Sequence, residues 1–133
     1  SHADGFQSVQ DALRDNGFDI PNEPKKRTNG IPSISIYIFP NCNHPGCLED
    51  LCLKSIAKDS ALPCVDIFFE CLTKRDIPPP RNIAKARVQT FLASRVEVGK
   101  RLGEAAKAGY WPWDNEEFDD IKHFLTELKR EIV

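Results

Sequence analysis

Two adjacent acids, Glu49 and Asp50, follow an apolar run at 33–39 and a polar loop, and they open a stretch with helical periodicity. Carboxylates between a strand and a helix suit Mg²⁺, which takes one or two protein carboxylates together with water or phosphate oxygens. A metal ion there could activate water for phosphodiester cleavage. The alternative is structural, because acids in the first turn of a helix stabilise the helix dipole.

Asp4 has the same two interpretations, since it precedes a predicted helix and could bind a metal or cap that helix. A second set of metal-ligand residue types, Cys42, His44 and Cys47, lies in the polar loop and could bind zinc. This loop lacks the paired spacings of structural zinc sites, so we favour buried or incidental thiols there.

Basic and aromatic residues could contact nucleic acid. The run 25–27 (Lys-Lys-Arg) and Lys85 could bind phosphates, and Tyr110, Trp111 and Trp113 could stack on bases. We favour the structural alternatives, in which the cations are solvated and the aromatic turn packs a helix onto the core.

The elements that position these residues are mostly helices. Residues 33–39 alternate, are rich in β-branched side chains and are apolar on both sides, which predicts a strand covered by helices on both faces. Cys64 and Cys71 are expected to share the core face of one helix. Apolar periodicity predicts helices at 6–16, 48–56, 62–72, 83–95 and 98–108 and from 114 onward, with a loop at 21–32.

Composition limits the class of protein. The chain has 133 residues, 29% of them charged, and a formal net charge of -2, which argues against a general nucleic-acid binder. No apolar run approaches the length of a membrane span, so we expect a soluble, cytoplasmic protein without a membrane partner. Five cysteines cannot all pair internally, which favours free thiols in a reducing compartment.

The first two residues, Ser1 and His2, have the character of a tag remnant, and the chain contains no Met. We therefore expect residues 1–133 to form a single domain that is a C-terminal portion of a longer chain.

Several segments in order carry a family resemblance: the run at 33–39 followed by Pro-Asn, LEDLCL at 48–53, KARVQTFLAS at 85–94, LGEAAKAGYW at 102–111 and a final acidic amphipathic helix. From about Asp4 onward the chain resembles an uncharacterised prokaryotic family of Toprim-like proteins, a domain of unknown function. The resemblance implies an α/β fold, a Toprim-like parallel sheet flanked by helices, here truncated at its N-terminus and rich in helix.

The resemblance extends distantly to the Toprim domains of overcoming-lysogenization-defect nucleases, which bind Mg²⁺ through a Glu after the first strand and an Asp-x-Asp motif after a later one. Asp4 is similar in position to the end of the Asp-x-Asp motif, with His2 in place of its first acid. Glu49 and Asp50 resemble acids that hold a second metal. Lys85 resembles a lysine that supports cleavage. The strand with the first Glu would lie upstream.

These observations lead to a main hypothesis, a Mg²⁺- or Mn²⁺-dependent, nuclease-like domain that processes nucleic acid. Asp4, Glu49 and Asp50 would bind the metal, and Lys85 would be catalytic. Because the strand with the first Glu would lie upstream, residues 1–133 by themselves are expected to be inactive. The alternative is a non-catalytic protein-interaction module on the same fold. An incomplete sheet would also leave an exposed edge, through which a second copy could bind.

Overall fold

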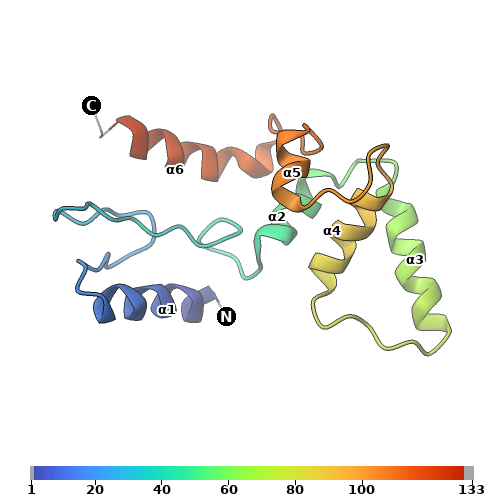
Figure 1. The fold of residues 1–133 in the computed structure, drawn as a ribbon, viewed down its shortest axis with the longest axis horizontal. Helices are drawn as coiled ribbons and strands as arrows, with labels where there is room; N and C mark the ends of the chain where they lie inside the picture. The colour runs from blue at the N-terminus through green and yellow to red at the C-terminus, as the bar shows by residue number, and fades with distance from the viewer. Residues whose placement is uncertain (1, 131–133) are drawn as a thin grey trace. The chain divides into compact units, whose positions relative to one another are not determined.

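The structure is a computed structural model that describes residues 2–130 of the chain. Helices joined by irregular loops make up this part of the protein (Figure 1). The predicted helices are confirmed, with small differences at their ends. In chain order they are α1 (His2–Asp15), α2 (Leu48–Ser55), α3 (Leu62–Lys74), α4 (Ile83–Ala93), α5 (Leu102–Lys107), the 3₁₀ helix η1 (Glu116–Phe118) and α6 (Asp119–Arg130).

The predicted fold class is wrong. Residues 2–130 contain no strand and no sheet, so the chain is not an α/β, Toprim-like fold with a parallel sheet flanked by helices. The predicted strand at 33–39 makes only one isolated antiparallel bridge, between Arg27 and Ser35. Two backbone bonds flank that bridge, from the Lys25 N–H to the Ile36 carbonyl (2.8 Å) and from the Thr28 N–H to the Ile34 carbonyl (2.9 Å).

The reason for this error is physical. Alternating apolar residues report burial on two sides, but they do not report which backbone will supply hydrogen bonds. Residues 33–39 are indeed covered by helices, since this segment lies between α1 and α6 (Figure 1), with Ile38 beside Gly5 of α1 and Tyr37 against Phe124 of α6. Pro32 and Pro40 bound the segment, and proline cannot donate to a ladder. A neighbouring strand is absent from the described residues, and a single strand cannot form a sheet.

The chain divides into two compact units. The first, here the terminal unit, contains residues 2–48 and 119–130 of the described chain, and the second, here the central unit, is Glu49–Phe118. In the terminal unit the Gln10 side-chain amide donates to the Pro21 carbonyl at 2.8 Å, which ties α1 to the long loop. On the other side of that loop Tyr37 packs against Phe124 of α6, with ring centroids 5.0 Å apart.

The core of the central unit forms around Trp111 and Phe91. Their rings stack with centroids 5.7 Å apart, and each side chain is at most 1% exposed. The Trp111 indole N–H donates to the Leu102 carbonyl at 3.4 Å, so the start of α5 is bonded to this core. The predicted structural role of the aromatic turn is therefore confirmed for Trp111. Further buried side chains come from each helix of the unit: Leu51, Cys52, Leu53, Val65, Val88, Leu92, Ala105 and Phe118.

Local sequence signals explain where three of the described helices begin. Asn82 caps α4, because its side-chain oxygen accepts the Lys85 backbone N–H at 2.9 Å. Just before η1, the Asn115 side-chain oxygen accepts the Glu117 backbone N–H at 2.9 Å. The helix predicted at 98–108 begins later, at Leu102, because Gly99 has a left-handed backbone with φ of +80°.

One core prediction is also wrong. Cys64 and Cys71 share a face of α3, as expected, but both are exposed. The buried face of α3 is instead the one that carries Val65 and packs on α4. A membrane-crossing helix is absent from the described residues, since none is both long and apolar enough.

We expect Trp111→Ala to lower the free energy of unfolding by about 3–5 kcal/mol, because it removes a buried aromatic side chain and leaves a cavity against Phe91. Urea denaturation followed by circular dichroism would measure the loss. Trp113→Ala is the matched control, since Trp113 is 47% exposed and should cost clearly less. Equal losses in the two variants would contradict this description of the core.

Candidate functional site

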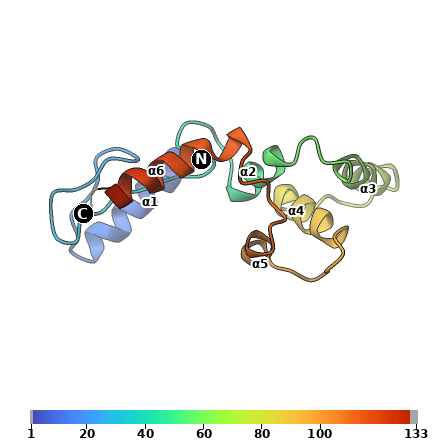
Figure 2. The ribbon, with the colours of Figure 1, turned by 90° about the horizontal axis from the view of Figure 1, so that it is seen from above.

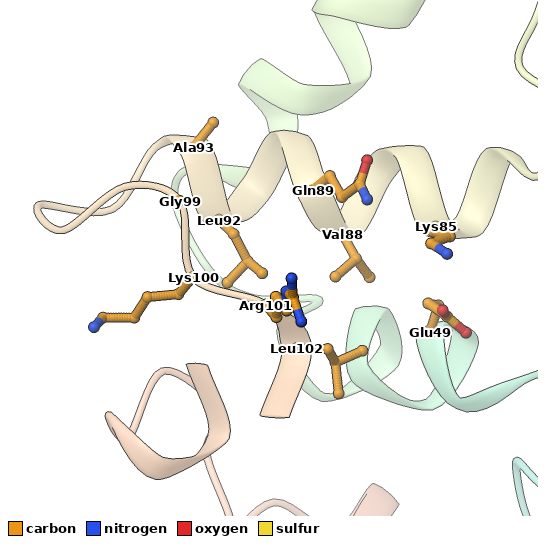
Figure 3. Close-up of a pocket in the computed structure, with 10 residues that line it drawn as sticks. All are labelled: Glu49, Lys85, Val88, Gln89, Leu92, Ala93, Gly99, Lys100, Arg101 and Leu102. Atoms are coloured by element: carbon orange, nitrogen blue, oxygen red, sulfur yellow. The ribbon is translucent and has the colours of Figure 1, made fainter. Parts of the chain in front are cut away.

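A cavity of about 640 Å³ opens in the central unit between α2, α4 and the segment 99–102 (Figure 3). Its floor is apolar, because Val88 and Leu92 project from α4 toward Leu102. Val88 and Leu92 are buried, and Leu102 is half-buried. Ligand pockets of this size usually combine such an apolar lining with a few polar groups.

Charged side chains surround this floor. Three cations, Lys85, Lys100 and Arg101, line the cavity together with one carboxylate, Glu49. Lys85 of α4 and Glu49 of α2 lie on facing sides of the cavity in Figure 3, and no ion pair joins them in the described chain. The local charge is therefore positive, in contrast to the net charge of the chain.

The three cations differ in how far they are available to a ligand. The Lys100 ammonium lies 2.7 Å from Glu97, which raises the pKa of Lys100 through a hydrogen bond and through charge attraction. In Figure 3 its side chain points away from the other lining residues. Lys85 and Arg101 are exposed, and no ion pair involves either of them within residues 2–130. These two cations are the available anion-binding groups of the cavity.

The structure separates the four site residues predicted from the sequence. Glu49 and Lys85 line the same cavity. Asp50 does not, since consecutive helical residues point about 100° apart. Asp4 belongs to the terminal unit. Sequence reasoning missed Arg101, whose only signal was a charge at the start of a short predicted helix.

The described residues contain no group of three or more His, Cys, Asp or Glu side chains that could hold a metal ion. In the proposed zinc loop, the Cys42 sulfur instead accepts the Ile38 N–H at 3.2 Å and is buried. The Asn41 side-chain oxygen accepts the His44 backbone N–H at 3.0 Å. This part of the loop is held by hydrogen bonds.

A cluster of titratable side chains lies in the terminal unit and joins α6 to the long loop between α1 and α2. The Lys25 ammonium lies 2.6 Å from one oxygen of Asp120, and the Tyr37 hydroxyl donates to the other oxygen at 2.7 Å. Lys25 also lies over the Tyr37 ring, 5.7 Å from its centroid. Because both carboxylate oxygens are engaged, we assign this cluster a structural role.

The pKa shifts of the cluster follow from these contacts. Burial raises the pKa of Tyr37, and the hydrogen bond to Asp120 and its charge raise it further. Burial alone would raise the pKa of Asp120, but hydrogen bonds from Lys25 and Tyr37 and the Lys25 charge bring it below 3.8. Burial likewise raises the pKa of the Cys42 thiol, despite the hydrogen bond from Ile38.

A family model described as "Protein of unknown function (DUF3226)" matches residues 1–130. The chain belongs to this family. The predicted membership of an uncharacterised family is confirmed, and no similarity to Toprim proteins accompanies it. No curated protein and no solved structure matches the chain. For this DUF3226 chain, functional inference therefore depends on the site itself.

We expect acid to destabilise the DUF3226 chain partly through Asp120. A carboxylate whose pKa is lowered by folding contributes stability above its unfolded pKa, near 3.8, and loses it as the pH falls through the lower folded value. Asp120→Asn should therefore lower the melting temperature near neutral pH and flatten the loss of stability below about pH 4. Thermal melts across pH would measure both effects.

Asp119→Asn is the control for this experiment, because Asp119 is exposed and lies 3.5 Å from Lys122 on the same helix. An acid profile that Asp120→Asn and Asp119→Asn change equally would contradict the assigned role of Asp120.

We expect the thiols to react with Ellman's reagent in two phases. Cys64 and Cys71 are exposed and should react rapidly, whereas Cys42 and Cys52 are buried and should react only after unfolding. The raised pKa of Cys42 also lowers its thiolate fraction. A Cys64→Ser/Cys71→Ser variant should lose most of the rapid phase, and an unchanged rapid phase would contradict these burial assignments.

Proposed function

We propose that this chain is a binding domain for a small phosphorylated organic ligand, held in the cavity of the central unit. The single observation that carries the proposal is the placing of Lys85 and Arg101 beside an apolar floor in one cavity of about 640 Å³. Phosphate would contact the two cations, and the organic part of the ligand would cover Val88, Leu92 and Leu102.

The choice of a phosphate follows from the chemistry of the cations. Arginine presents a planar set of donors that matches phosphate oxygens, and lysine supplies a compact charge. Lys85 is on α4, which is capped by Asn82, and Arg101 precedes α5, which is bonded to Trp111. Both cations therefore project from anchored backbone, and this anchoring reduces the ordering cost of binding.

The choice of a small ligand follows from the size and the balance of the cavity. Its volume lies within the range of pockets for small molecules, and its floor is mainly apolar. A nucleic acid would favour an extended basic surface, whereas the chain carries a formal net charge of -2. We therefore favour a small ligand over nucleic acid, although the terminal phosphate of a nucleic acid would use the same two cations.

Mg²⁺-dependent cleavage of nucleic acid is the second candidate, because Glu49 and Lys85 line one cavity. The residues at the cavity do not fit a resident Mg²⁺ or Mn²⁺ ion, since one carboxylate is accompanied by three cations. Binding without catalysis is therefore the function that the geometry supports best.

The location of the protein in the cytoplasm, which the sequence suggested, also stays a prediction.

We expect AMP, used as a probe, to bind this domain more tightly than adenosine or inorganic phosphate in isothermal titration calorimetry. Lys85→Glu and Arg101→Glu should each raise the dissociation constant about tenfold or more, because each removes a charge-assisted hydrogen bond and adds repulsion. No AMP binding at concentrations up to about 1 mM would contradict the proposal.

Lys54→Glu is the matched control, because it makes the same charge change at an exposed position of α2 that does not line the cavity. If Lys54→Glu weakened AMP binding equally, the effect would come from the net charge of the chain and not from the cavity. The same titration with Mg²⁺ alone, repeated with Glu49→Gln, tests the second candidate: magnesium binding that depends on Glu49 would favour a metal site over the phosphate site proposed here.

A further inference from the structure

The exposed face of α3 carries apolar residues over two turns of helix. Cys64, Ile67, Phe68 and Cys71 recur at the spacing that places side chains on one face. Ile67 is 62% exposed and Phe68 is 48% exposed, and both cysteines are exposed. In Figures 1 and 2, α4 runs along one side of α3, and among the described helices of the central unit none covers the other side.

The apolar surface extends beyond this face. Phe68 also lines a groove between α3 and α4 together with Phe69, Leu72 and Pro80. Contiguous apolar patches larger than about a few hundred Å² are rare on soluble monomers and usually mark an interaction site. The face of α3 is therefore the strongest candidate interface on the described part of the central unit.

The charges on this face favour a second copy of this chain as the partner. Ile67 and Cys71 line a shallow hollow with one acid, Glu70, and two bases, Lys74 and Arg75, one turn further along α3. All three charged residues are exposed, and none of their side chains has an ion-pair partner within residues 2–130. A surface that places an acid before bases on one helix is complementary to its own copy turned end to end.

We propose that α3 is the interface of a homodimer, in which the α3 helices of two copies pack antiparallel about a two-fold axis near Cys71. Glu70 of each copy then faces Lys74 or Arg75 of the other copy, and the symmetry makes this contact twice. Ile67 and Phe68 become covered at both ends of the contact, and the two Cys71 thiols lie close together.

This surface is separate from the phosphate cavity, so the proposal does not depend on the proposed function. The sequence suggested a different dimer, formed through the exposed edge of a sheet. The described residues contain no sheet, so that interface is not open to them. A helix pair alone is a small interface, so we expect a dissociation constant on the order of 10 µM.

Sedimentation velocity of the full chain from about 1 µM to about 500 µM tests the proposal. We expect a concentration-dependent dimer, and Ile67→Asp should raise its dissociation constant about tenfold or more, because it buries a charge in the interface. Ile67 is too exposed for this change to unfold α3, and circular dichroism would verify the helix content. A monomer at all concentrations, or a dimer unaffected by Ile67→Asp, would overturn the proposal.

Charge reversal tests the antiparallel arrangement. Glu70→Lys and Lys74→Glu should each weaken the dimer, since each places like charges opposite one another, whereas the double variant should regain most of the affinity. Failure of the double variant to recover would overturn the arrangement. Val96→Asp is the control, because Val96 is fully exposed outside α3. An equal effect of Val96→Asp would also overturn the proposal.

Discussion

The carboxylate of Asp120 is the interaction on which the terminal unit depends. It joins α6 to two loop residues, Lys25 and Tyr37, which are 95 and 83 positions away along the chain. Lys25 has a left-handed backbone, with φ of +69°, a conformation that non-glycine residues rarely adopt. The ion pair and the contact with the Tyr37 ring help to hold this residue in place. A loop with little regular hydrogen bonding is thus fixed through its side chains.

Trp111 has the corresponding role in the central unit, and it also connects the core to the candidate site. Its ring stacks on Phe91 of α4, and its indole N–H bonds to the carbonyl of Leu102. These two contacts anchor two of the three segments that line the cavity. The backbone beside Lys85 and Arg101 is consequently set by the packing of the core, which favours a preformed binding site over one that must be ordered by its ligand.

The two surface features of the central unit, the cationic cavity and the exposed apolar face, lie on different helices. The cationic cavity lies at α2, α4 and the segment before α5, whereas the exposed apolar face lies on α3. The proposed ligand and the proposed second copy would therefore use separate surfaces. Because the family itself has no assigned function, these side chains carry the argument for function.

The helices could be predicted from the sequence, because apolar periodicity is a local signal, and capping side chains such as Asn82 and Asn115 act locally too. It also indicated two candidate site residues, Glu49 from its position after a predicted strand and Lys85 through a resemblance whose implied fold was wrong. The packing of the chain could not be predicted in the same way: it brings these two residues into one cavity with Arg101, and it leaves residues 33–39 with no strand beside them within the described chain. The physical reason is that periodicity reports which faces are buried, whereas partners distant in the sequence are chosen only when the chain packs.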